Sequence, residues 1–296
     1  MTRSILLTGA GGQLGRALSE REWPGDVQLV ARTRAEMDIG DAAMLASCDL
    51  SRFDAVINAA AYTAVDKAEE DIEAAWRGNA IGPALLARAC RQAGAALVHI
   101  STDYVFDGSA SVPLQPGDPV APRSVYGASK LAGEIAIRSS LADHAIIRTA
   151  WVYGAGGRNF VSTMLRLAGE RAAVSVVDDQ VGSPTQAGDL AEAAARTALA
   201  LIGNDDPRLR GTYHFTNSGA ASWAGFAAEI FRLSAERGGP SAQVNRIPTR
   251  DYPTPATRPA YSVLDSTALA QAIDFVPRPW EEALAATIDD FIGDYR

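Results

Sequence analysis

Short apolar runs alternate with longer alanine-rich stretches along the first half of the chain. The apolar runs predict β-strands at Ser4–Thr8, Val27–Ala31, Ala55–Asn58, Ala96–Ser101 and Ala145–Thr149. The alanine-rich stretches predict helices at Gln13–Glu20, Asp71–Ala93 and about Val125–Ser139. Strands that are apolar along their whole length are typical of a parallel sheet covered on both faces. The pattern therefore predicts a doubly wound α/β fold.

After about Trp151 the alternation becomes looser. The remaining periodic stretches predict helices at Asn159–Arg171, Gly188–Ile202, Trp223–Glu236 and Trp280–Tyr295, and strands at Val174–Val177 and Gly211–Thr216. The proline-rich segment Pro248–Pro259 predicts a loop. We expect a nucleotide-binding domain made of residues 1–150 plus about 186–215. Residues of about 151–185 and 216–296 are expected to form a smaller C-terminal substrate-binding α/β region.

Composition and charge narrow the classes of function. Hydrophobic residues make up 47% of the chain and charged residues 21%, as in ordinary soluble proteins. The net charge is −8 and no basic stripe is present, so we expect neither a nucleic-acid partner nor a membrane partner. No signal segment and no apolar run of about 20 residues is present, which favours a cytoplasmic protein. The composition leaves monomer and homodimer open.

A glycine-rich turn follows the first predicted strand. In "TGAGGQLGRAL", Gly9, Gly12 and Gly15 lead from the strand into a helix. Glycines at such a turn let a pyrophosphate approach the backbone, and the free amides of the helix N-terminus then face the phosphates. The position near the N-terminus favours a Rossmann-type dinucleotide site over a simple strand–helix turn.

Basic residues follow the second predicted strand, where NAD-binding proteins usually carry an acidic residue. The segment "ARTRAEMDIGD" offers Arg32, Thr33 and Arg34, which suit a 2′-phosphate. NADPH is therefore the expected cofactor, although NADH is possible and the arginines could simply solvate a loop. Small alanines after the third strand, in "NAAAYT", leave space for a flat ring or a ribose.

A lysine stands four positions after a tyrosine in "SVYGASKLAGE". The chain has 27 lysines and arginines, and only Lys67 and Lys130 are lysines. Residues i and i+4 share one face of a helix, so Tyr126 and Lys130 are expected to face the same cleft. A nearby ammonium would lower the phenol pKa and so suit Tyr126 to donate a proton to a ketone. The alternative is an exposed lysine at a helix end.

Further motifs cover nearly the whole chain, including "STDYVFDG", "RTAWVYG", "DDQVGSPT" and "YPTPATRPAYSVLD". With these motifs the chain resembles the dTDP-4-dehydrorhamnose reductases, a family of the extended short-chain dehydrogenase/reductase superfamily. The resemblance implies that a hydride passes from NAD(P)H to C4 of a dTDP-sugar, dTDP-4-dehydro-L-rhamnose. The implied product is dTDP-L-rhamnose.

The resemblance also implies roles for single residues. Tyr126 would be the proton donor and Lys130 its electrostatic partner, while Thr102 and Asp103 would bind the reacting sugar. The implied cofactor contacts are Gly12, Gln13 and Leu14 at the phosphates, Asp38 and Ile39 at the adenine, and Ala60, Ala61 and Tyr62 at the ribose–phosphate region. Trp151 would pack on the sugar and nicotinamide side. The implied contacts with the nucleotide half of the substrate are Gln180, Ser183 and Arg258.

Some relatives carry metal-binding glutamates at a dimer contact, but position 17 is alanine here, so no metal is expected.

Two other functions stay open. A relative of these reductases is a non-catalytic NADP-binding regulatory subunit of methionine adenosyltransferase, and other relatives are reductases or epimerases of different nucleotide sugars. The intact Thr102, Tyr126 and Lys130 favour an enzyme over a regulatory subunit.

Overall fold

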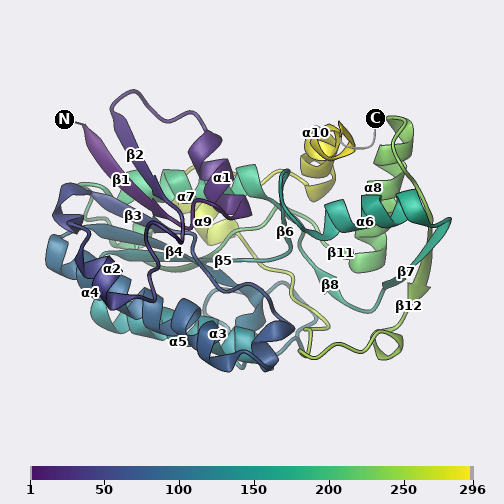
Figure 1. Cartoon of the computed structure of the whole chain (residues 1–296), viewed down its shortest axis with the longest axis horizontal. Helices are drawn as coiled ribbons and strands as arrows, with labels where there is room; N and C mark the ends of the chain where they lie inside the picture. The colour runs from purple at the N-terminus through teal and green to yellow at the C-terminus, as the bar shows by residue number, and fades with distance from the viewer. Residues whose placement is uncertain (1, 294–296) are drawn as a thin grey trace.

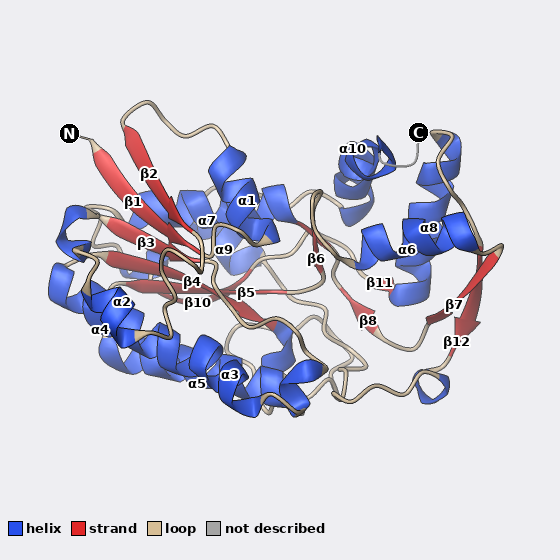
Figure 2. Cartoon of the chain, viewed as in Figure 1, coloured by secondary structure: helices blue, strands red, loops and turns tan. Residues whose placement is uncertain are grey.

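The computed structural model describes residues 2–293 and contains a six-stranded parallel sheet with helices on both faces (Figures 1 and 2). The strands are β1 (Arg3–Thr8), β2 (Val27–Arg32), β3 (Ala55–Asn58), β4 (Ala96–Thr102), β5 (His144–Thr149) and β10 (Gly211–His214). Their order is β10-β5-β4-β3-β1-β2, so the chain reverses direction across the sheet between β1 and β3. In doubly wound sheets, ligands bind at such a point beyond the carboxyl ends of the strands. The predicted fold class is confirmed.

The two faces of the sheet bury alternate residues of each strand. Ile5 and Leu7 of β1 pack in a core with α1 (Gln13–Glu20), α7 (Ala187–Leu201) and α9 (Thr267–Ala272). Leu6 points the other way, into a core with α2 (Ala42–Ala46), α4 (Gly82–Ala93) and α5 (Val125–Ser140). Both faces are covered, and this explains why the strands are apolar throughout. Within residues 2–293, no helix is long and apolar enough to cross a membrane.

A third core lies beside the carboxyl edge of the sheet and belongs to a smaller region of the molecule (Figure 1). Its helices are α6 (Phe160–Glu170), α8 (Trp223–Glu236) and α10 (Trp280–Ile292). Three two-stranded sheets accompany them: β6 (Val152–Tyr153) with β9 (Thr185–Gln186), β7 (Ala173–Val177) with β12 (Gln243–Ile247), and β8 (Val181–Gly182) with β11 (Ala221–Ser222). The chain enters this region after β5, returns to the main sheet through α7 and β10, and enters it again at β11. The proposed domain boundaries stay a prediction.

The long helix predicted at Asp71–Ala93 is confirmed over residues 72–93, but it is not α-helical throughout. It consists of α3 (Ile72–Trp76), a π-helical turn η3 (Arg77–Ile81) and α4, without a break between them. Pro83 has no N–H to donate to the carbonyl of Asn79, so a regular α-helical ladder cannot run through this turn. The helix predicted at Trp280–Tyr295 corresponds to α10, and its residues 294–295 lie outside the described residues.

Candidate active site

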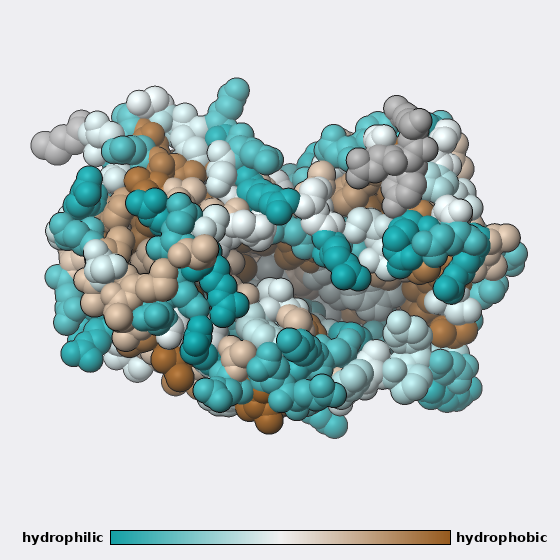
Figure 3. All heavy atoms as spheres, in the orientation of Figure 1, coloured by the Kyte–Doolittle hydropathy of each residue, from teal (hydrophilic) through white to brown (hydrophobic). Residues whose placement is uncertain are grey.

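A cavity of about 640 Å³ opens at the carboxyl ends of β1, β3 and β4, where the molecular surface is hollowed between the sheet and the smaller region (Figure 3). Its wall brings together most residues of the predicted site. They are Gly9, Gly12, Gln13, Leu14, Asp38, Ile39, Ala60, Ala61, Tyr62, Thr102, Asp103, Tyr126, Lys130, Trp151 and Arg258. Four predicted residues lie off this wall: Gly15, Arg32, Gln180 and Ser183.

The glycine turn is shaped by close backbone contacts. Gly9 has a φ of +75°, and a Cβ atom there would lie 2.5 Å from the backbone nitrogen of Ala60. A Cβ atom at Gly15 would lie 2.1 Å from the carbonyl oxygen of Gly9, so Gly15 lets α1 pack onto the turn without reaching the cavity itself. No side chain caps the N-terminus of α1 at Gly12, and its first amides can therefore serve a ligand.

The basic residues at the end of β2 and beyond it differ in their position relative to the cavity. Arg32 faces Glu36, 3.7 Å away, and lies off the cavity wall, so its contact with the cofactor stays a prediction. Arg34 and Arg77 line the cavity instead, and both hold the carboxylate of Asp38, at 3.3 and 2.7 Å. The sequence could not reveal Arg77, because it comes from the π-helical turn 39 residues after Asp38.

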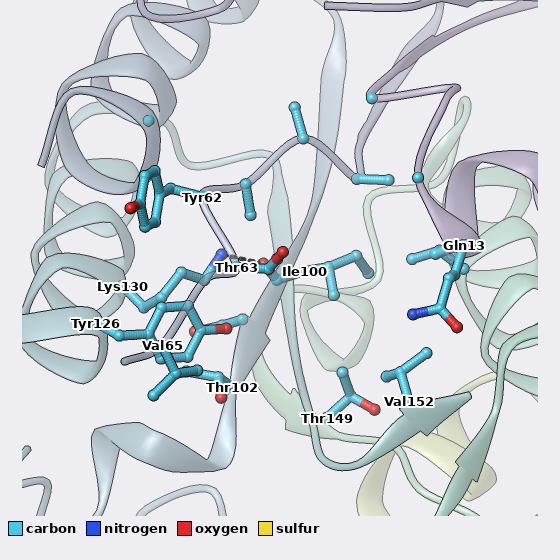
Figure 4. Close-up of a pocket in the computed structure, with 18 of the residues that line it drawn as sticks. Gln13, Tyr62, Thr63, Val65, Ile100, Thr102, Tyr126, Lys130, Thr149 and Val152 are labelled. Atoms are coloured by element: carbon cyan, nitrogen blue, oxygen red, sulfur yellow. Dashed lines mark hydrogen bonds between the residues drawn. The ribbon is translucent and has the colours of Figure 1, made fainter. Parts of the chain in front are cut away.

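Tyr126 and Lys130 lie on one face of α5 and reach the same cavity, as the spacing predicts (Figure 4). The Ser124 hydroxyl caps the start of the helix by accepting a hydrogen bond from the Gly127 amide at 3.1 Å. A Cβ atom at Gly127 would lie 2.2 Å from the Tyr104 carbonyl oxygen, so this glycine allows α5 to approach the loop after β4. Tyr126 and Lys130 are both buried.

The expected lowering of the Tyr126 pKa by Lys130 is wrong. Burial raises the pKa of the Tyr126 phenol, and the opposing influence is a hydrogen bond with Thr102. The amine of Lys130 donates to the carbonyl oxygen of Ile100 at 2.6 Å (Figure 4). Burial lowers the pKa of Lys130 to about 8. The phenol therefore stays protonated at neutral pH, whereas the amine titrates close to it.

Thr102 is the last residue of β4 and Asp103 follows it, and both are buried on the cavity wall. The Thr102 hydroxyl donates to Asp103 Oδ1 at 3.0 Å, and Asp103 Oδ2 has no hydrogen-bond partner of normal geometry. Burial raises the pKa of Asp103 to about 6, although the nearby Ser262 hydroxyl lowers the pKa of the carboxyl group. An unpaired carboxyl oxygen in a cavity can accept a hydrogen bond from a hydroxyl-rich ligand. Thr149, at the end of β5, presents a second buried hydroxyl without a partner, which the sequence analysis missed.

Trp151 has a strained backbone conformation at the point where the chain passes from β5 into the smaller region. Its φ is +48°, a conformation that residues other than glycine rarely adopt and that clusters at functional sites. Its ring stacks on that of Trp223, with centroids 3.4 Å apart, and Trp223 also lines the cavity. Trp223 was missed because it begins α8, far from every recognised motif.

Of the three residues predicted to contact the nucleotide half of the substrate, only Arg258 lies on the cavity wall. Gln180 is buried and its amide donates to the Thr249 hydroxyl at 3.1 Å. Ser183 is fully buried near the carbonyl of Gly219. Arg258 does line the cavity, where it donates to the Tyr104 phenol oxygen at 2.9 Å and to Asp66 Oδ2 at 2.6 Å. The substrate contacts of these residues stay predictions.

Comparisons with known proteins agree with the resemblance drawn from the motifs. The model of the family described as "RmlD substrate binding domain" matches residues 2–292. The chain is 42% identical over 281 residues to the spore coat polysaccharide biosynthesis protein SpsK of Bacillus subtilis, covering 95% of both chains. It is 42% identical over 290 residues to the dTDP-4-dehydrorhamnose reductase of Streptomyces griseus, covering 97% of this chain and 94% of the relative.

A solved structure gives the same result. The dTDP-4-dehydrorhamnose reductase of Bacillus anthracis, crystallised in complex with NADP, superposes with a TM-score of 0.90 at 36% identity. The match covers 98% of this chain and all of that structure's chain. The resemblance drawn from the motifs is confirmed. The chain belongs to the RmlD family, the family of the dTDP-4-dehydrorhamnose reductases.

Proposed function

We propose that this chain uses NADPH to reduce the C4 ketone of dTDP-4-dehydro-L-rhamnose, giving dTDP-L-rhamnose. The observation that carries the proposal is the buried pair Tyr126 and Lys130, which faces the cavity at the carboxyl edge of the sheet. Relatives over the whole length of the chain carry the name of this activity. We propose that residues 1–150 and about 186–215 bind the cofactor, and that the rest binds the sugar nucleotide.

The residues around the glycine turn fit a dinucleotide. Side chains at Gly9 and Gly15 would collide with backbone, and the uncapped N-terminus of α1 offers amides for a pyrophosphate. Arg34 and Arg77 would hold the 2′-phosphate of NADPH, since both reach the cavity near the end of β2. Asp38 already pairs with both guanidinium groups, so it would orient them toward the ligand. NADH, which lacks this phosphate, would bind more weakly.

The chain's own residues donate the proton and hold the ketone in position. Bound NADPH supplies the hydride. Tyr126, protonated because burial raises its pKa, gives its phenolic proton to the ketone oxygen as the carbon–oxygen double bond becomes a single bond, and is left as a tyrosinate. Lys130, in its ammonium form, stabilises that negative charge. Thr102 and Asp103, which line the cavity, would bind sugar hydroxyls beside the reacting carbon.

The test is the absorbance of NADPH at 340 nm when purified protein is mixed with dTDP-4-dehydro-L-rhamnose. The native chain should consume NADPH, and Tyr126→Phe should lower kcat by about 10²–10⁴-fold, the usual contribution of a general acid. The affinity for NADPH should change little. Tyr153→Phe is the matched control, because its hydroxyl is buried without a partner and lies off the cavity wall. If Tyr126→Phe kept the native rate, the proton donor would be another group.

A further inference from the structure

Three neighbouring strands place a line of buried polar residues below the cavity. Thr8 of β1 is in register with Asn58 of β3, and Asn58 is in register with His99 of β4. All three are fully buried. The Thr8 hydroxyl donates to Asn58 Oδ1 at 2.7 Å, and Asn58 Nδ2 lies 2.9 Å from His99 Nδ1. His99 Nε2 lies 3.5 Å from the Lys130 amine, so the line ends at a predicted catalytic residue.

The orientation of Asn58 fixes which nitrogen of His99 carries hydrogen. The Ala60 backbone N–H, which can only donate, points at Asn58 Oδ1 at 3.1 Å. The amide nitrogen of Asn58 must therefore face His99, and His99 Nδ1 accepts its hydrogen. Burial lowers the pKa of His99 well below its ordinary value, so the ring is neutral. A neutral imidazole has one N–H, and it is on Nε2, facing Lys130.

An N–H that points at Lys130 discriminates between the two states of the amine. A neutral amine can accept this hydrogen with its lone pair while it donates to the Ile100 carbonyl oxygen. An ammonium has three donors and no acceptor, so it would meet the His99 N–H donor to donor.

Other charged or titratable groups surround this arrangement. Glu134, one turn further along α5, raises the pKa of Lys130, but its carboxylate is held by Arg148, at 2.8 Å, and by the Ser101 hydroxyl, at 2.6 Å. The remaining neighbours are Arg138, bound to Glu134, His144 of β5, which acts on His99, and Tyr126 on the cavity side.

We propose that Asn58 fixes His99 as the Nε2–H tautomer and thereby makes His99 a positioning residue that favours the neutral amine of Lys130. Its consequence for turnover rests on the proposed function, in which the ammonium form of Lys130 stabilises the tyrosinate. Asn58 and His99 would then set the pH above which the reductase loses activity. Neither residue lies on the cavity wall, so both act through Lys130.

The chain offers a direct test by NMR because it has two lysines and three histidines. Protein labelled with 13C at lysine Cε and with 15N in the histidine rings gives one signal for Lys130 and one for the exposed Lys67, an internal control. In the native chain, His99 should have a protonated Nε2 and an unprotonated Nδ1 throughout the neutral range. The signals of His144 and His214 are the ring controls.

The matched variant is Asn58→Asp, which has nearly the same shape. The aspartate can keep the Thr8 and Ala60 hydrogen bonds with one oxygen and accept a hydrogen from His99 Nδ1 with the other. Nε2 then becomes an acceptor for the Lys130 ammonium, and the titration midpoint of Lys130 should rise by about 1–2 pH units. The pH at which kcat decreases on the alkaline side should rise by the same amount, while the titration midpoint of Lys67 stays unchanged.

Three outcomes would overturn the inference: a native His99 protonated on Nδ1, a Lys130 midpoint that stays or falls in Asn58→Asp, or a rise that persists in Asn58→Asp/His99→Gln. The last outcome would assign the rise to the added carboxylate alone. The NMR readout needs no substrate. An inactive native chain with the expected tautomer would therefore refute the proposed function only, and an active chain with the opposite tautomer would refute this inference only.

Discussion

Asp103 makes the candidate active site a source of instability at neutral pH. Its side chain is 2% exposed, one carboxyl oxygen has no hydrogen-bond partner of normal geometry, and burial raises its pKa from the ordinary 3.8 to about 6. Each tenfold change in this equilibrium corresponds to about 1.4 kcal/mol, so the ionised carboxylate costs the folded state about 3 kcal/mol. Asp103→Asn cannot ionise and escapes this cost, although its unpaired amide costs about 1–3 kcal/mol at every pH.

The sign of the pH dependence follows from the raised pKa. Below about pH 4 the carboxyl is protonated in both the folded and the unfolded chain, and ionisation contributes nothing. Between about pH 4 and 6 the unfolded chain releases the proton while the folded chain retains it, so the native protein loses stability as pH rises. The free energy of unfolding of Asp103→Asn relative to the native chain should therefore increase by about 2–3 kcal/mol from pH 4 to pH 7.

Urea unfolding followed by tryptophan fluorescence at pH 4, 5, 6 and 7 measures this difference. Asp107→Asn is the control, since Asp107 lies in the same loop and hydrogen bonds from Ser109 lower its pKa. Its difference from the native chain should not grow with pH. A stability difference for Asp103→Asn that stayed constant, or shrank, as pH rose would refute the assignment of a raised pKa. Activity should fall in Asp103→Asn at every pH, whatever the change in stability, because Asp103 faces the reacting sugar in the proposed function.

Three further changes test other parts of the structure. Lys130→Arg should lower kcat by more than about tenfold, because the wider guanidinium does not fit the buried site at the Ile100 carbonyl. The NADPH assay at 340 nm measures this rate, and a native rate would contradict the prediction. Arg148→Met should lower the free energy of unfolding by about 3–5 kcal/mol in urea titrations, because it leaves the fully buried Glu134 without its main partner; a loss below about 1 kcal/mol would contradict it. Gly15→Ala should weaken NADPH binding in fluorescence titrations by more than about tenfold, since its Cβ would meet the Gly9 carbonyl oxygen, whereas Gly25→Ala, off the cavity wall and with open space around its Cβ, should bind normally.

Local patterns in the sequence were enough to predict the sheet, the glycine turn and the Tyr126–Lys130 pair, whereas the family resemblance implied most other residues of the cavity wall. A strand buried on both faces must be apolar throughout, so the runs that became β1, β3, β4 and β5 were visible directly. The spacing of Tyr126 and Lys130 placed them on one helical face because helical geometry is local. The π-helical turn within the Asp71–Ala93 helix was less visible in the sequence, although Pro83 indicated an irregularity there.

Tertiary structure decided everything that depends on which distant residues meet and how deeply they are buried. The register of three strands aligned Thr8, Asn58 and His99, and no local pattern encodes that alignment. Packing of the π-helical turn brought Arg77 to Asp38. Burial reversed the expected direction of the Tyr126 pKa shift, since removing a phenol from water disfavours its charged form. The sequence by itself determined the fold class and the types of chemical group at the site, whereas their protonation states depend on solvent exclusion, which only the folded chain creates.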